Sequence, residues 1–210
     1  MGRQVKQSHS LHTRDRILKA VCLGLILFVT FGVIESHAYD EQSIKHLSHT
    51  NMCQECDLTN ADFRNRDFRF ADLRRANLQF ANLSGAKFYW ANLYRADLTG
   101  ANLLETDLSG ANLYGSKIVS AEATGAIFRG ADLRDIDFRR TNLSGADFSP
   151  FNVLWYWATQ VSGANFLEAN LHKANLTDLD LRDASSEQMQ IESSILCRTI
   201  TVQGERNRNC

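Results

Sequence analysis

The chain has 210 residues, of which 44% are hydrophobic and 22% are charged. Its 23 Lys and Arg and 24 Asp and Glu give a formal net charge of −1 at pH 7. This balance argues against a strongly acidic surface of the kind that could imitate nucleic acid.

Residues 1–38 have the pattern of a secretory signal peptide. A basic stretch from Arg14 to Lys19 precedes an apolar run from Ala20 to Ile34, and Ser-His-Ala before Tyr39 fits the small-x-small rule for cleavage. The apolar run is shorter than the roughly 20 residues that span a bilayer. We therefore expect a periplasmic or extracellular protein whose mature chain begins near Tyr39. An uncleaved signal that serves as a membrane anchor is the alternative, and it is the only membrane contact expected.

Residues 39–55 are expected to form an N-terminal cap. The segment DEQSIKHLSHTN, residues 40–51, can form a short helix over the first coil of a repeat structure. A repeat structure built from strands exposes edges that would otherwise pair with other chains, so terminal caps are expected.

A five-residue repeat extends over residues 56–183. In ANLYRADLTGANLLETDLSGANL, residues 91–113, every fifth residue is Leu, Asn or Asp precedes it, and a small residue precedes that. On an α-helix such leucines would spiral around the axis, and on a continuous strand they would alternate between faces. They share one interior only if the chain turns a corner in every repeat, so four repeats form one square coil.

The predicted core consists of the central residues of these repeats. A narrow coil has room for one large side chain per face, which explains the small residue two positions before each centre. Asn and Asp side chains hydrogen-bond the neighbouring backbone at the bends. Gly and Ser at the fifth position ease the corner. The predicted centres are Leu58, Phe63, Phe68, Leu73, Leu78, Leu83, Phe88, Leu93, Leu98, Leu103, Leu108, Leu113, Ile118, Ala123, Phe128, Leu133, Phe138, Leu143, Phe148, Phe166, Leu171, Leu176 and Leu181.

The A(D/N)LXX motif of residues 56–183 resembles the pentapeptide-repeat family, and the flanks resemble its exported bacterial members. The resemblance implies an all-β fold, a right-handed quadrilateral β-helix (pentapeptide-repeat solenoid) with short capping segments at both ends. Residues twenty apart would stack at strand spacing, roughly 4.8 Å.

The repeat breaks at FNVLWYWATQVSG, residues 151–163, within an irregular coil. The centres Phe148 and Phe166 are 18 residues apart, so this coil is either two residues short or carries a local insertion. We favour the short coil, which places Phe166 beneath Phe148. The break also gathers Trp155, Tyr156 and Trp157, which either plug the irregular coil or contact a partner.

Residues 184–210 are expected to form a C-terminal cap. Its segment SSEQMQIESSIL, residues 185–196, opens with a capping-box pattern from Ser185 to Gln188.

Four cysteines remain in the expected mature chain, because Cys22 lies in the signal. In an oxidising compartment Cys53–Cys56 and Cys197–Cys210 would form two local disulfides that staple the ends. The alternative is a zinc site with four thiolates, although the two pairs flank opposite ends of the repeat. A thioredoxin-like role lacks the βαβ unit, and haem attachment lacks a His after Cys56.

Outward positions predict a candidate partner-binding surface around one corner. It would mix aromatic rings with guanidinium groups, a combination suited to cation–π pairing and to anionic or glycan ligands. The alternative is that these columns only stabilise neighbouring coils. The predicted columns pair Phe70 with Trp90, Arg69 with Tyr89, Arg74 with Tyr94 and Tyr114, and Arg75 with Arg95.

No catalytic function is expected. The sequence offers no nucleophile with an adjacent base, no paired buried carboxylates and no metal-ligand spacing, and an interior filled with Leu and Phe leaves no pocket. We therefore expect neither an enzyme nor a cofactor or metal.

Three functions were weighed. The best-known activity in the family is DNA mimicry that inhibits a topoisomerase, but residues 56–183 contain 16 acidic and 14 basic residues. Duplex DNA of the same length would carry roughly 18 charges. We expect instead a non-catalytic exported interaction or scaffold module that contacts an unidentified protein or an anionic envelope polymer, and no nucleic acid. A structural rod with no specific ligand is the further alternative.

Overall fold

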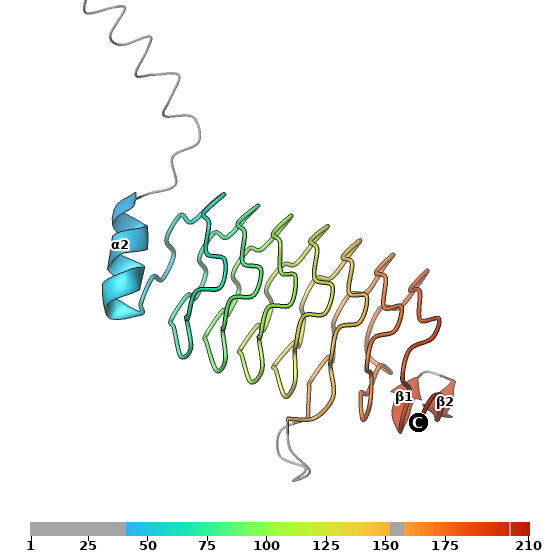
Figure 1. The fold of residues 1–210 in the computed structure, drawn as a ribbon. Coiled ribbons are helices and arrows are strands. Elements are labelled where there is room, and N and C mark those ends of the chain that lie inside the picture. The colour runs from blue at the N-terminus through green and yellow to red at the C-terminus, as the bar shows by residue number, and fades with distance from the viewer. Residues whose placement is uncertain (1–40, 152–157, 202) are drawn as a thin grey trace, which may run out of the picture. The chain divides into compact units, whose positions relative to one another are not determined.

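A computed structural model of the chain describes residues 41–151, 158–201 and 203–210. Along the chain these residues form helix α2 (Glu41–Thr50), a series of stacked coils, and a hairpin of strands β1 (Thr199–Thr201) and β2 (Gly204–Arg206). Figure 1 shows α2 beside the first coil and the hairpin beside the last. The predicted signal peptide lies outside the described residues.

Each coil contains twenty residues and has four corners. Parallel bridges join residues twenty apart, from Met52 with Asp72 to Ile127 with Asp147. Between coils, the Leu58 amide donates to the carbonyl of Asn77 at 2.8 Å. These pairings close the backbone of one coil onto the next, so the chain forms the predicted four-sided β-helix although few residues lie in long strands.

Each side of a coil ends in a turn that contains one residue with positive φ. At the first such corner Ala61 donates its amide to the Leu58 carbonyl at 3.1 Å, and Asn60 has φ 60°. A left-handed residue at the third position is what a type II turn requires. Side chains at this position and the one before it therefore form a column along every corner of the solenoid.

All of the predicted repeat centres are buried in one core. Phenylalanine rings stack from coil to coil within it, with centroids 5.2 Å apart for Phe68 and Phe88 and 5.1 Å apart for Phe128 and Phe148. The positions two before the centres hold mainly Ala. Where Thr106 replaces Ala, its hydroxyl donates to the Leu83 carbonyl at 2.9 Å, so the buried polar group is satisfied.

The irregular segment is an insertion, and the prediction of a short coil is wrong. Asp132 bridges to Gln160, 28 residues on, and the same offset continues through the next three bridges. Phe166 therefore stacks on Phe138, with centroids 5.3 Å apart and an interplanar angle of 19°. It meets Phe148 only edge-on, at 6.3 Å. The eight additional residues leave the coils in register on either side. Trp155, Tyr156 and Trp157 fall outside the described residues.

The N-terminal region begins with the short helix that the sequence predicts. Leu47 of α2 is buried in the core, and Ile44 packs partly against it. Coil pairing already begins at Met52, before the predicted start of the repeat. Cys53 and Cys56 are joined by a disulfide, one of the two expected pairs.

The C-terminal region differs from the expected cap. Instead of a separate segment with a capping box, residues 185–200 form a further coil, with bridges that end at Asp180 with Ile200. The reason is that Ile191 and Leu196 continue the five-residue spacing, and Leu196 is buried in the core. Gln188 is a corner residue with φ 56°.

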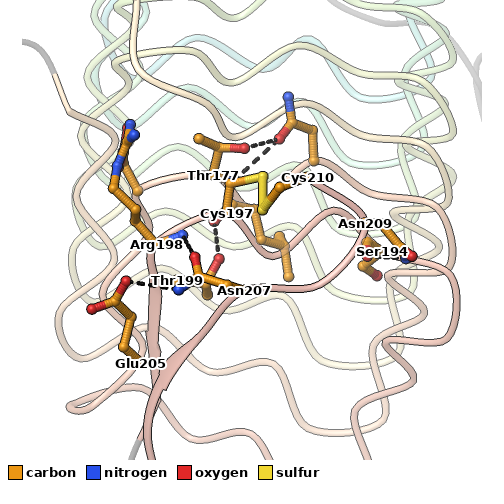
Figure 2. The surroundings of a disulfide bond; sticks show 12 residues. Thr177, Ser194, Cys197, Arg198, Thr199, Glu205, Asn207, Asn209 and Cys210 are labelled. Carbon is orange, nitrogen blue, oxygen red and sulfur yellow. Dashed lines mark hydrogen bonds and ion pairs between the residues drawn. A yellow bond between two sulfur atoms is a disulfide. The ribbon is translucent and has the colours of Figure 1, made fainter.

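The second expected disulfide, Cys197–Cys210, connects this last coil to the chain end. Figure 2 shows the hydrogen bonds around it: the Arg198 amide donates to Asn207 Oδ1 at 2.7 Å, and Asn209 Nδ2 donates to the Ser194 carbonyl at 2.9 Å. The final residues are thereby fixed against the coil that precedes them.

Candidate functional site

The predicted surface residues occupy two adjacent corners of the solenoid and flank one of its sides. We call Arg69, Phe70, Tyr89 and Trp90 the aromatic corner, and Arg74, Arg75, Tyr94, Arg95 and Tyr114 the Tyr94 corner. The outward residues of the side between them are Asp72, Asn92, Asn112, Asp132 and Gln160, one from each successive coil.

The aromatic corner forms a connected cluster of rings. Phe70, which is 67% exposed, meets Tyr89 edge-on at 6.1 Å, and Tyr89 meets Trp90 at 5.9 Å. Phe151 completes the cluster, with centroids 5.5 Å from Tyr89 and 6.3 Å from Trp90. The cluster is therefore larger than the four residues that the sequence singles out.

Phe151 is the residue that sequence reasoning missed. It follows the coil of Phe148, which lies three coils beyond that of Phe88. The start of the insertion must therefore run back along the solenoid to reach Tyr89. Periodicity could not reveal this contact, because Phe151 lies after the repeat pattern has stopped; an apolar residue directly behind Pro150 was the only signal.

A groove of about 410 Å3, partly open to solvent, begins at Trp90 and follows this side of the solenoid. It exists because the bulky Trp90 is followed at the same corner by Gly110 and Gly130, which leave the space of a side chain empty. Its lining consists of Trp90, Ala91, Asn92, Gly110, Ala111, Asn112, Gly130, Asp132, Ala158 and Gln160.

The polar residues of the groove are mostly uncharged amides. Asn92 Oδ1 accepts the Tyr94 amide hydrogen and Asn112 Oδ1 accepts that of Tyr114, each at 3.1 Å. Within the described part of the chain, neither Nδ2 donates to another residue, and none of the buried side-chain polar atoms lacks a partner. These carboxamide nitrogens are thus available as donors on the groove side.

The Tyr94 corner is a stacked ladder of rings and guanidinium groups. Tyr94 and Tyr114 stack with centroids 5.7 Å apart and an interplanar angle of 14°. The guanidinium of Arg95 lies 5.2 Å from the centre of the Tyr94 ring, and that of Arg134 lies 5.3 Å from Tyr114. Both are cation–π geometries. A hydrogen bond with Asp135 raises the pKa of the Tyr114 phenol, because ionisation would place two negative charges together.

Most arginines of the two corners are neutralised by carboxylates. The ion pair of Arg74 with Asp72 spans 2.7 Å, and it lowers the pKa of Asp72 because the guanidinium stabilises the charged carboxylate. The other pairs are Arg69 with Asp67 at 2.7 Å and Arg75 with Glu55 at 3.0 Å. The surface therefore has less free positive charge than the sequence projection suggested.

Residues suited to metal binding or membrane insertion were also sought. Among the described residues, no group of three or more His, Cys, Asp and Glu side chains is arranged to hold a metal ion. Nor does any helix in the described ranges have the length and apolar character needed to cross a bilayer.

A family model for pentapeptide repeats matches the chain in eight copies, over residues 53–88, 91–130, 119–149 and 158–185. None of the curated proteins compared with the chain matches it. Pentapeptide repeat proteins form a right-handed quadrilateral β-helix, in agreement with the four-sided coils described above, and are generally structural or interaction proteins rather than enzymes.

Similar solved structures include three pentapeptide repeat proteins. HetL, involved in heterocyst differentiation regulation in the cyanobacterium Nostoc sp. strain PCC 7120, is 24% identical and has a TM-score of 0.31; the alignment covers 80% of this chain and 99% of HetL. A protein of the Arabidopsis thaliana thylakoid lumen is 28% identical, with a TM-score of 0.32 and coverage of 57% and 79%.

The third, full-length QnrB1, is a plasmid-mediated fluoroquinolone resistance protein with 16% identity, a TM-score of 0.29 and coverage of 71% and 91%. The assignment of this chain rests on the repeat match itself, which spans more than half of the sequence. The chain belongs to the pentapeptide repeat family.

Proposed function

We propose that the chain is a non-catalytic interaction module, exported to the periplasm or the cell exterior, that binds a component of the cell envelope. The binding surface consists of the aromatic corner, the groove and the Tyr94 corner. The observation that carries this proposal is the exposed ring cluster of Phe70, Tyr89, Trp90 and Phe151, which borders a groove. Exposed apolar surface with a polar border is typical of interaction sites.

The fold supports a function on the outside of the solenoid. Leu and Phe side chains fill the interior of every coil, so a ligand has to bind to the corners and sides. Repeat scaffolds commonly bind through such extended surfaces. In this proposal α2 and the C-terminal hairpin protect the open edges of the first and last coils.

Export is supported by the signal-like residues 1–38 and by the pairing of all four remaining cysteines. Disulfides persist in the periplasm and outside the cell but are rare in the cytosol. The partner in this proposal is an envelope protein or polymer, and nucleic acid is not among the expected ligands.

The proposal can be tested by photo-crosslinking in cells that export the protein. A photo-reactive phenylalanine analogue is placed at Phe70 or Arg95 on the proposed surface, and at Phe80 as a control. Phe80 is a matched control because it is also an exposed phenylalanine at a corner with positive φ, being 59% exposed with φ 57°, but it lies at another corner.

We expect the same envelope component to be captured from Phe70 and Arg95 and not from Phe80. Equal or no capture from all three positions would favour a structural rod with no specific ligand and would contradict the proposal.

A further inference from the structure

The groove beside Trp90 combines two kinds of surface that are seldom found together on this solenoid. At one end stand the rings of Trp90 and Phe151, which are in mutual contact. Along its length lie the carboxamides of Asn92, Asn112 and Gln160. A ligand that satisfies both must carry apolar faces as well as many groups that exchange hydrogen bonds with amides.

The charges around the groove favour an uncharged ligand. The only ionisable side chain in its lining, Asp132, is already bound to Arg134, with Nη2 and Oδ2 2.6 Å apart. Beside the groove, Arg74 is paired with Asp72 in the same way. An anionic ligand would have to compete with these carboxylates for the guanidinium groups, whereas an uncharged ligand leaves every ion pair intact.

The groove also repeats along its axis. Its polar residues come from successive coils, joined by bridges between Asn92 and Asn112, Asn112 and Asp132, and Asp132 and Gln160. Neighbouring polar groups are therefore separated by about one strand spacing, roughly 4.8 Å. A partly open, repeating groove fits an elongated ligand whose own polar groups recur along a chain.

On the basis of the interaction function described above, we propose that this groove binds an uncharged polysaccharide. A sugar ring has an apolar C–H face and an edge of hydroxyl groups. Trp90 and Phe151 contact the C–H faces of the sugar. The Asn92 and Asn112 Nδ2 groups donate hydrogen bonds to its hydroxyls, and the Gln160 carboxamide both donates and accepts.

The test begins with the exported, purified protein on an array of uncharged and acidic glycans. Affinity electrophoresis then follows in gels that contain hydroxyethyl cellulose, dextran or the anionic dextran sulfate. We expect binding to uncharged glycans and retardation in at least one uncharged gel. Raising the salt concentration should leave this retardation unchanged, since no charge pair is formed between protein and ligand.

The decisive variants are Asn112→Ala and Asn102→Ala. Both asparagines precede a repeat centre, and both accept a backbone amide hydrogen at 3.1 Å, from Tyr114 and Leu104 respectively, but Asn102 lies on another side of the solenoid. The two substitutions should therefore affect stability alike. We expect Asn112→Ala to weaken binding roughly fivefold to tenfold, the loss of about one hydrogen bond, and Asn102→Ala to leave it unchanged. Gln160→Ala, which removes an exposed side chain, should also weaken binding.

Three results would overturn the proposal: no binding to any uncharged glycan, binding to acidic glycans alone that disappears at high salt, or equal effects of the two asparagine substitutions. If crosslinking from Phe70 and Arg95 nevertheless captured an envelope protein, the interaction function would stand and only the polysaccharide assignment would fail.

Discussion

The indole ring of Trp90 lies over Gly110, the residue at the same corner of the next coil. A Cβ atom added at position 110 would lie 2.8 Å from each of the two carbons of the fused ring bond. Gly110 is thus required not only for its φ of +67° but also because the neighbouring coil uses the space above it. The same pair of residues produces the end of the groove.

Substitution of Gly110 by Ala should be more destabilising than the matched change at Gly145. Gly145 has φ +68°, but an added Cβ would meet nothing within 4 Å. Gly145→Ala therefore isolates the backbone cost, about 1–2 kcal/mol for a residue with Cβ in this conformation. Gly110→Ala must in addition displace Trp90. Urea unfolding measures both, and near-ultraviolet circular dichroism should change only for Gly110→Ala. Equal stabilities with an unchanged spectrum would contradict the packing of Trp90 over Gly110.

Two adjacent leucines should differ sharply in their contribution to stability. Leu103 is completely buried at a repeat centre, whereas Leu104 is 40% exposed at the following corner. We expect Leu103→Ala to lower the free energy of unfolding by about 2–5 kcal/mol, since it removes core packing and leaves a cavity. Leu104→Ala should change it by less than about 0.5 kcal/mol. Comparable losses in chemical denaturation would show that the inward and outward positions are assigned incorrectly.

The ion pair of Arg74 with Asp72 should make stability depend on pH in the acidic range. Its guanidinium lowers the pKa of Asp72 below the ordinary 3.8. Because the folded-state pKa is the lower one, the stabilisation is fully present above pH 3.8 and is lost as the pH falls through the folded-state value.

Replacing Arg74 by Met should raise the pKa of Asp72 toward 3.8 and flatten the acid dependence of stability. Arg95→Met, which removes a guanidinium lying over the Tyr94 ring, is the control. NMR titration of the side-chain carboxyl carbons reports the Asp72 pKa directly. An unchanged value in Arg74→Met would rule out the pairing in solution.

Removing the C-terminal disulfide should cost more stability than removing the N-terminal one. Cys197 and Cys210 are 13 residues apart, whereas Cys53 and Cys56 are only three apart. In the chain-entropy account, a loop of about 15 residues contributes about 3 kcal/mol and a shorter loop contributes less. Double Cys→Ala variants of each pair, compared by urea unfolding, test this order. A larger loss from the Cys53–Cys56 pair would point to core packing by the buried Cys53 instead.

The exported chain should begin at Tyr39 and contain no free thiol. Cleavage after Ala38 removes Cys22, and the four remaining cysteines are paired. Cell fractionation, N-terminal sequencing and alkylation under denaturing conditions test these points together. A full-length protein in the cytoplasm with alkylated cysteines would contradict export.

Most of the fold could be predicted because the repeat is local. Each pentapeptide carries its own inward residue and its own turn, so the centres from Leu58 to Phe148 could be assigned before any contact was known. The break was harder, because a spacing of 18 residues fits both a short coil and an insertion. The pentapeptide Thr159-Gln-Val-Ser-Gly163 carried the missing signal: a small residue, an amide, an apolar centre, and Ser-Gly at the corner.

The candidate surface could be predicted only in outline. Stacking of residues twenty apart correctly brought Tyr94 onto Tyr114 and placed the two corners next to each other. The return of Phe151 to Tyr89 depends on a path that no periodicity describes. The neutralisation of Arg69 and Arg74 was missed as well, although Asp stands two residues before each, at Asp67 and Asp72.

The offset of 28 between Asp132 and Gln160 means that this solenoid treats its interior and its corners as separate inheritances. Eight residues were added at one corner while each bridge beyond it kept its partner type and spacing. Segments of other lengths and compositions could be grafted between Ser149 and Thr159 without repacking a single leucine. New recognition elements can thus arise at that splice point while the scaffold carries them unchanged.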